Sequence, residues 1–448
     1  SDAEEISQLR QQMALLQRRL DAIEAREAAQ AAEAAKPQQA PAPTAAAAPA
    51  AKPAPDAVTV KLGSKGLSFA TADKKYTFSI RTRLQADAHF FPDASDGNND
   101  FSIRRAILSF RGSAGYMNWV FSPNFGGGST VIDDAWIEIA PSDLFHLAAG
   151  KIQSFEGLEN IQSNAKLLFA ERGLPSNLVP GREIGLKLTG NLPNKFVNYG
   201  LALTDAALDS TSQNTNANLS GDLGGAANIT LTPYAEDKDA FLSGLAVGLS
   251  VSASDEKTTI DSTNADRTIK FKSAGRATFI TIQNGVAVDG MRGRINPQLY
   301  YYHGPFGFLS EYVASKMHLS RGGIEQSITN RAWTAQASWV ITGENASYSG
   351  VKPAHPFAFG ADGGWGAFEI GARYNSFKGD DALFSGGAST MLATSASTQK
   401  ADAWGLAIKW YLTENLLWAL NFENTDFGGL GADRDTEQAF TTRMQIDF

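Results

Sequence analysis

Cysteine is absent from the 448 residues of the chain. This absence excludes disulfide bonds and thiolate catalysis, and it removes most structural zinc sites. No stretch of about 18 apolar residues occurs either, which excludes helical membrane spans. That criterion does not exclude the strands of a membrane β-barrel, because such a strand needs only about 9 to 11 residues of alternating character.

The motifs of common enzymes are missing as well. No HExxH, Gly-x-Ser-x-Gly, phosphate loop or dinucleotide fingerprint is present. The histidines are scattered, with no pair at the i, i+4 spacing of a metal-binding helix: His89, His146, His303, His318 and His355. We therefore expect no enzyme activity, no metal and no cofactor.

The net charge of −8 is modest and argues against nucleic acid as a partner. Ser1 rather than Met opens the sequence and no apolar leader follows, so we expect the numbering to start after a cleaved leader, which is compatible with export. The length allows several soluble domains or one large closed architecture. The 42 glycines and only 43% hydrophobic residues favour the closed architecture.

The first part of the chain has a helical period. Apolar residues recur at steps of three and four, at Ile6, Leu9, Met13, Leu16, Leu20 and Ile23. This spacing predicts a coiled-coil oligomerisation helix over residues 1–30, and a single amphipathic helix lying on this protein or a partner is the alternative. Residues 31–57 are rich in Ala and Pro, which predicts an extended linker without a core.

From about Val58 the helical period gives way to alternation. In residues 76–89 apolar side chains share one face, and the other face carries Ser79, Arg81, Arg83, Gln85 and Asp87. The last nine residues, FTTRMQIDF, alternate in the same way. An apolar outside and a polar inside are typical of a water-filled membrane β-barrel, so we expect an all-β transmembrane barrel over residues 58–448.

Connections of two lengths separate the expected strands. Short turns are expected at 141–143, 192–195 and 413–415, and long polar loops at 205–228, 254–267 and 378–400. Short turns at one end and long loops at the other match an outer-membrane barrel. Between Gly150 and Gly190 lie roughly thirty residues without a period of two, longer than the usual ~12 to 15 residues of a structureless connection. We expect this insert to be functional.

Short segments stand in order along the body: RLQAD at 83–87, IRRA at 103–106, DDAWI at 133–137, GLE at 157–159, AER at 170–172, PGREIGLKLTG at 180–190, GPFG at 304–307, ITGE at 341–344, GAFEIGARY at 366–374 and WYLTENLLWALNFENTDF at 410–427. In these segments the chain resembles the phosphate-selective porin O and P family of Gram-negative bacteria. The resemblance implies a homotrimer of 16-stranded antiparallel barrels in outer-membrane lipid, each with its own pore. The long insert would be the loop that folds into the barrel and narrows the channel.

The resemblance also implies a constriction for small anions, lined by arginines and a lysine. Arg83 matches a pore arginine of the family, Arg104 and Arg105 match its arginine pair, and Asp133 matches an acidic pore residue. Asn160 departs from the family pattern, because phosphate-selective members carry a central lysine after GLE. This departure leaves general anion passage, or another small acidic solute, open beside phosphate.

Neighbouring charges have alternative interpretations. Arg81 faces the same side as Arg83. Both arginines line the constriction, or one or both of them solvate a wide channel wall. Adjacent Arg104 and Arg105 both face the lumen only through a bulge, and otherwise one of them lies in the trimer interface or at headgroup level. Lys151 is either a pore residue or a brace.

Charged residues of the insert also allow two interpretations. Paired carboxylates could serve acid and base catalysis, whereas buried charges that tie an infolded loop to the wall must be paired. We favour the bracing role for Glu159, Glu171, Arg172 and Arg182.

The combined expectation is a trimeric outer-membrane porin for passive diffusion of small anions, phosphate among them. The alternative is a substrate-specific channel for dicarboxylates or sugars on the same fold. Two other function classes are alternatives. An outer-membrane lipase would require a Ser with a His partner on the outer face of the barrel, and a secreted β-adhesin would be soluble without detergent. The coiled coil would project into the periplasm, where it stabilises the trimer or sets a distance to the cell wall.

Overall fold

The computed structural model describes residues 57–93, 97–213, 223–237, 240–360 and 363–448. The chain divides into two units, Ser1–Ala54 and Pro55–Phe448, and the expected coiled coil and almost all of the linker lie outside the described residues. Within the described ranges no helix has the length and apolar character needed to cross a membrane.

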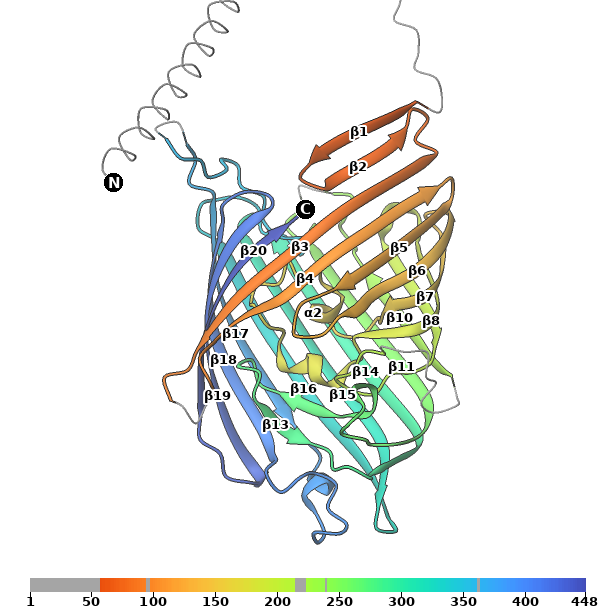
Figure 1. The fold of residues 1–448 in the computed structure, drawn as a ribbon, viewed down its shortest axis with the longest axis vertical. Coiled ribbons are helices and arrows are strands. Elements are labelled where there is room, and N and C mark those ends of the chain that lie inside the picture. The colour runs from red at the N-terminus through yellow and green to blue at the C-terminus, as the bar shows by residue number, and fades with distance from the viewer. Residues whose placement is uncertain (1–56, 94–96, 214–222, 238–239, 361–362) are drawn as a thin grey trace, which may run out of the picture. The chain divides into compact units, whose positions relative to one another are not determined.

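Sixteen antiparallel strands form a closed barrel (Figure 1), as the family resemblance predicted. Each strand pairs with the next along the chain, and β20 returns to pair with β3. In order, the strands are β3 (Tyr76–Phe90), β4 (Asp100–Ala114), β5 (Met117–Asn124), β6 (Val131–Ser142), β7 (Phe145–Gln153), β8 (Arg182–Asn191), β9 (Val197–Thr204), β10 (Gly224–Leu231), β11 (Leu245–Thr259), β14 (Ala287–His303), β15 (Phe306–Arg321), β16 (Ile324–Val340), β17 (Ala367–Lys378), β18 (Thr398–Tyr411), β19 (Leu416–Gly431) and β20 (Glu437–Asp447).

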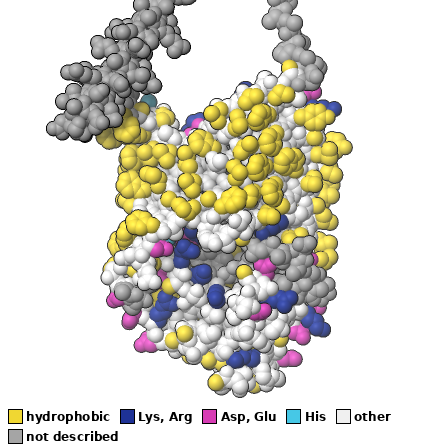
Figure 2. All heavy atoms as spheres, in the orientation of Figure 1, with side chains coloured by type: hydrophobic (Ala, Val, Ile, Leu, Met, Phe, Trp, Pro, Cys, Tyr) yellow, Lys and Arg dark blue, Asp and Glu magenta, His cyan; other side chains and the backbone are white. Residues whose placement is uncertain are grey.

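The outer face of the barrel is apolar. On β18, Trp404, Leu406 and Ile408 are exposed, whereas the alternating Ala407 and Lys409 are buried toward the inside. Figure 2 shows hydrophobic side chains covering a band in the upper part of the visible wall, with charged side chains mainly below it. This alternation is the pattern of strands that face lipid on one side.

The wall is uneven in height. Strands β5, β9 and β10 have 8 residues each, β7 has 9 and β8 has 10. Strands β14 and β16 have 17 residues each, and β15 has 16. We call β5 and β7–β10 the short-strand wall.

The two rims differ in their connections. Phe448 lies at one rim, beside the turn 412–415, because Asp447 N–H donates to Asn415 O at 2.9 Å. This C-terminal rim also holds the short connections 115–116, 143–144, 192–196 and 304–305. Several connections depart from the expected division: 322–323 and 432–436 are short connections at the opposite rim, and 232–244 and 341–366 are long connections at the C-terminal rim. The expected loop tracts 205–228 and 254–267 also proved partly to be strand, in β10 and β11.

A hairpin outside the closed ring extends the sheet at this rim. β1 (Val58–Gly63) pairs with β2 (Gly66–Thr71), which pairs with the first residues of β3. β3 therefore has β2 as its neighbour at its start and β20 as its neighbour further along.

The inside of the barrel is not polar throughout, contrary to the expectation from alternation. Residues 260–286 fold into the lumen and carry the hairpin β12 (Lys270–Lys272) and β13 (Thr278–Thr281). Phe271 and Phe279 pack on Phe377 of β17, with ring centroids 4.9 and 5.1 Å apart, inside a buried apolar cluster. The inner face of β15–β18 is apolar here because it receives this hairpin rather than water.

Candidate functional site

The predicted insert folds into the lumen as residues 154–181, which we call the pore loop. It carries α2 (Leu158–Ile161) and the 3-10 helix η1 (Leu174–Leu178). The backbone N–H groups of Leu158 and Glu159 donate to the Glu311 carboxylate on β15, at 2.6 and 3.2 Å. These bonds satisfy amides that the start of a helix leaves without partners, and they fix the pore loop to the long-strand side of the barrel.

Three glycines of the wall make room for the pore loop, and at the tightest of them a Cβ on Gly200 of β9 would lie 2.3 Å from the ring of Phe155. A Cβ on Gly371 of β17 would lie 2.7 Å from a methyl group of Leu168, and a Cβ on Gly405 of β18 would lie 2.9 Å from the ring of Phe169. A glycine inside a strand often marks such a close approach. The apolar side of the pore loop is therefore seated against bare backbone.

Glu159 contacts both the pore loop and the wall. Its side chain accepts from Gly173 N–H at 2.7 Å and pairs with Arg373 of β17 at 3.3 Å. Arg373 also pairs with Glu423 of β19 and is fully buried. Buried charges need such partners, because an unpaired one is strongly destabilising.

The pore loop also spans the seam where β20 meets β3. On the lumen side three directly opposed pairs cross this seam, Arg443 with Asp87, Gln445 with Gln85, and Asp447 with Arg83. Each pair is hydrogen-bonded to the pore loop as well, through Ala170 O, through Asn164 O and Ala165 O, and through Ser163 Oγ, respectively. We call these residues the seam cluster.

A bulge in β4 decides the orientation of the arginine pair. Gln85 lies opposite Arg105 and Ala86 lies opposite Ile103, so Arg104 is an extra residue on β4. Arg104 reaches Glu171 of the pore loop at 2.6 Å, and Arg105 donates to Gln85 at 2.8 Å. Both arginines thus point inward, the geometry that a bulge permits.

Glu171 is held ionised at this place. Burial alone would raise its pKa, but the guanidinium groups of Arg104, Arg105 and Arg443 hold the pKa of the Glu171 carboxyl well below its usual range. Glu171 therefore joins β4 and β20 through the pore loop.

Arg172 and Asn160 of the pore loop and Arg182 of β8 are engaged in different ways. Arg172 donates to Glu159 O at 2.8 Å and to Asn164, and burial lowers its pKa to about 10, so it stays charged at neutral pH. Arg182 pairs with Asp134 at 3.3 Å. The amide of Asn160 donates to Glu156 O and Pro180 O at 3.1 and 2.8 Å, so it holds the pore loop together.

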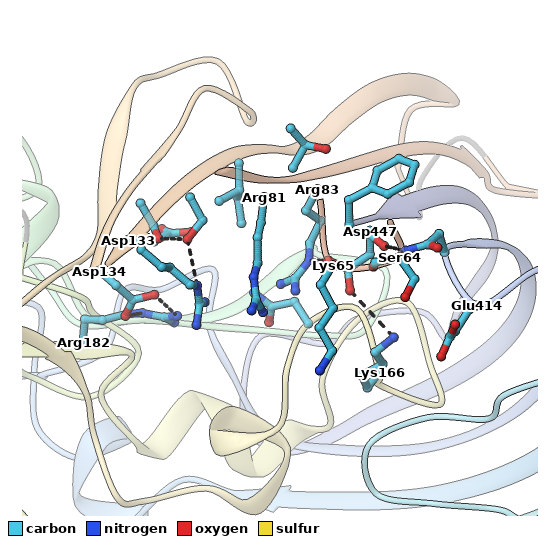
Figure 3. Close-up of a pocket in the computed structure, with 18 residues that line it drawn as sticks. Ser64, Lys65, Arg81, Arg83, Asp133, Asp134, Lys166, Arg182, Glu414 and Asp447 are labelled. Atoms are coloured by element: carbon cyan, nitrogen blue, oxygen red, sulfur yellow. Dashed lines mark hydrogen bonds and ion pairs between the residues drawn. The ribbon is translucent and has the colours of Figure 1, made fainter. Parts of the chain in front are cut away.

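One cavity of about 300 Å³ lies at the C-terminal rim side of the pore loop. Figure 3 shows Arg81 and Arg83 extending from β3 into it, with Arg182 beside Asp134 and Lys166 near Asp447. Six cationic and four acidic side chains line the cavity, Lys65, Arg81, Arg83, Arg111, Lys166 and Arg182 with Asp133, Asp134, Glu414 and Asp447. We call it the rim cavity.

The cations of the rim cavity are not equally compensated. Arg83 is 2.9 Å from Asp447, which Lys166 also approaches at 3.7 Å. Among the described residues no carboxylate forms an ion pair with Arg81 or Arg111. Sequence analysis missed Arg111, although it alternates with Ser109 on the inner face of β4.

A second cavity of about 680 Å³ lies between the pore loop and residues 262–276. Its charged lining consists of five cations and one acid, namely Arg104, Arg172, Lys270, Lys272 and Arg276 with Glu171. Eight hydroxyl side chains also line it, at Ser176, Ser210, Thr211, Ser212, Ser262, Thr263, Thr268 and Ser273. We call it the hairpin cavity, because Lys270, Lys272 and Arg276 belong to the β12–β13 region.

Two further predicted site residues, Asp133 and Lys151, lie on the neighbouring strands β6 and β7. Asp133 of β6 lines the rim cavity and accepts from Asn124 at 3.3 Å. Lys151 of β7 is buried, and no ion pair joins it to a carboxylate within the described part of the chain. In the same part of the chain no three His, Asp or Glu side chains are grouped so that they could hold a metal ion.

Several solved structures share this fold. The outer membrane channel DcaP of Acinetobacter baumannii has a TM-score of 0.53 at 10% identity, over 83% of this chain and 97% of that one. A loop-deletion mutant of OmpT from Vibrio cholerae gives 0.52 at 10% identity, over 84% and 100%. An anion-selective porin from Comamonas acidovorans gives 0.50 at 10% identity, over 83% and 100%.

A search of curated protein sequences found no match. The family described as phosphate-selective porin O and P matches residues 78–448, which include all but the first two residues of the closed barrel. The chain therefore belongs to the phosphate-selective porin O and P family.

Proposed function

We propose that this outer-membrane porin passes small anions by passive diffusion, through a constriction formed by the pore loop and the wall of β3–β8. The observation that carries the proposal is the charge of the two cavities. The rim cavity has an excess of two positive side chains and the hairpin cavity an excess of four, although the whole chain has a net charge of −8.

Fixed cations select anions where a passage is narrow and partly desolvated, because the attraction is less screened there than in bulk water. Arginine adds a planar pair of donors that suits phosphate and carboxylate. Several cations form no ion pair among the described residues, so they would act on a passing anion most directly: Lys65, Arg81, Arg111, Lys151, Arg172, Lys270, Lys272 and Arg276. Arg83, Arg104 and Arg182 would act beside their carboxylate partners.

The experiment is the zero-current potential of the purified protein in a planar bilayer under a KCl gradient, repeated with added phosphate. We expect a chloride-selective potential. Reduced chloride conductance on adding phosphate would place phosphate among the solutes despite Asn160. A cation-selective potential would contradict the proposal.

A channel for small organic anions is the second candidate. The eight hydroxyl groups of the hairpin cavity favour it, because they can hydrogen-bond a carboxylate or a sugar hydroxyl beside the cations. Liposome swelling with a panel of dicarboxylates, sugars and inorganic anions separates the two candidates. Faster entry of dicarboxylates than of chloride would favour the organic solutes.

Three copies are proposed to assemble through the short-strand wall. A strand that spans a bilayer needs about 9 to 11 residues, and β5, β9 and β10 have 8 each. Stacked rings of Phe78, Phe110 and Phe121 continue onto this wall at β5, and aromatic residues are enriched in protein interfaces. Native mass measurement in mild detergent should give three times the chain mass of 47.8 kDa, and a monomer would contradict the trimer.

The proposed orientation places the C-terminal rim and residues 1–57 in the periplasm. Its support is the short connections at that rim, which are typical of the periplasmic side of outer-membrane barrels. Residues 1–30 would then form a trimeric stalk that sets a distance to the cell wall. Deleting residues 1–57 should leave single-channel conductance intact, and loss of conductance would overturn the idea of a separate stalk.

A further inference from the structure

The connection between β16 and β17, described at residues 341–360 and 363–366, passes from the inside of the barrel to the outside across the C-terminal rim. Its first half lies inside: Ala346 and Val351 are buried in an apolar cluster with Tyr411 and Leu417. Tyr348 donates to Leu158 O of the pore loop at 2.6 Å. This half is anchored to the protein itself.

The second half lies against the outer face. Phe357 N–H donates to Leu412 O at 2.6 Å, and the Phe357 ring meets Trp410 edge-on at 5.3 Å. The indole N–H of Trp410 donates to Trp365 O at 2.7 Å. Trp410 shares the outward side of β18 with exposed Ile408, since the intervening Lys409 is buried. The segment is thereby fixed to the outside of the wall.

Two large aromatic side chains of this half have little protein contact. Phe359 is 96% exposed and Trp365 is 75% exposed. The Phe359 ring contacts Phe357 at 5.0 Å, and Trp410 continues the row to Trp418 of β19 at 6.4 Å. The row is thus continuous with the apolar outer face of β18 and β19, the face that contacts lipid.

The geometry points to Phe357, Phe359 and Trp365 as a lipid anchor that inserts into the phospholipid headgroup region beside the barrel. Trp prefers this depth because its ring is apolar and its indole N–H is polar, and Phe adds the apolar surface with which interfacial anchors insert at the boundary of headgroups and acyl chains. Because the aromatic row is continuous with the lipid-facing wall, we infer that these side chains contact the bilayer. A second copy of the chain would be expected at the short-strand wall instead.

The absence of cysteine allows a direct test. In Phe359→Cys an environment-sensitive fluorophore labels a single site, and the protein is reconstituted into vesicles of phosphatidylethanolamine and phosphatidylglycerol. Ala354→Cys is the matched control, because Ala354 is exposed on the same segment but outside the aromatic row. Nitroxide lipids labelled at the headgroup or deep in the acyl chain report the depth.

We expect blue-shifted emission from position 359, with quenching by headgroup nitroxides several-fold stronger than at position 354 and stronger than by deep nitroxides. Water-like emission at 359, equal to that at 354, would overturn the anchor. Blue-shifted emission that no nitroxide lipid quenches would also overturn it, since a protein surface would then cover the site. Single-channel conductance of both labelled proteins should equal that of the unlabelled chain, which separates this test from that of anion passage.

Discussion

Replacing Arg81 by Gln should weaken anion selectivity, whereas replacing Arg83 and Asp447 together should not. Arg81 and Arg83 lie on the same side of β3 and line the same cavity. Arg83 forms an ion pair with Asp447 at 2.9 Å, and no carboxylate of the described residues pairs with Arg81. Arg81→Gln removes one net positive charge, while Arg83→Gln with Asp447→Asn removes a cation and an anion.

The expected size follows from Coulomb's law. A fixed charge about 4 Å from a passing ion contributes about 1 kcal/mol even at the dielectric constant of water. The contribution has opposite sign for anion and cation, so its loss changes the permeability ratio by about 2 kcal/mol, or about thirtyfold. Salt screening reduces the electrostatic contribution of the fixed charge. We therefore expect the anion-to-cation permeability ratio to decrease roughly five- to thirtyfold in Arg81→Gln.

The assay is the zero-current potential in a KCl gradient, measured on the three proteins in parallel. The paired double variant should stay within about twofold of the parent ratio, because its net charge is unchanged. Equal potentials for Arg81→Gln and the parent would refute the assignment of Arg81 to the conducting path. A larger loss in the double variant than in Arg81→Gln would refute the reasoning from net charge.

Further predictions concern the pore loop, the seam and the hairpin cavity. Gly405→Ala places a Cβ 2.8 Å from Glu423 Cγ of β19 and 2.9 Å from the ring of Phe169, so it should displace the pore loop and increase conductance or its noise, whereas Gly428→Ala, where nothing lies within 4 Å, should conduct like the parent. Arg443→Met leaves buried Asp87 unpaired and should destabilise the barrel by about 3 to 5 kcal/mol in urea unfolding, and Arg443→Met with Asp87→Leu should restore most of this loss. Burial, Arg276 and Arg104 lower the pKa of Lys272 below 10.5. Because a lysine loses its charge as the pH rises through its pKa, anion selectivity should already decrease at pH values below 10.5. The variant Lys272→Gln should lack this decrease. An unchanged potential up to pH 10.5 in the parent would contradict it.

The strands and the position of the pore loop could be predicted because their signals are local. The alternation expected over residues 76–89 corresponds to β3, Tyr76–Phe90. The insert expected between Gly150 and Gly190 lies between β7 and β8, at residues 154–181. Strand residues face lipid and the lumen alternately, so a period of two identifies β3, and the loss of that period identifies the insert.

The rest depends on which strands are neighbours and on how their registers match. The inward orientation of both Arg104 and Arg105 follows from an extra residue against β3, which no local pattern determines. The cations at Lys270 and Lys272 did have a local signal, since they alternate with buried Ile269 and Phe271. Their position beside Arg172 required the long-range fold. The coiled coil and the linker stay predictions.

The seam cluster links closure of the barrel to placement of the pore loop. The residues that join the last strand to the first also hold the pore loop, through the backbone oxygens of Asn164, Ala165 and Ala170. A barrel that closed without its loop in place would be a wide leak in the membrane that it serves. Here the final strand completes both the wall and the constriction, so the channel is expected to be narrow from the moment it is sealed.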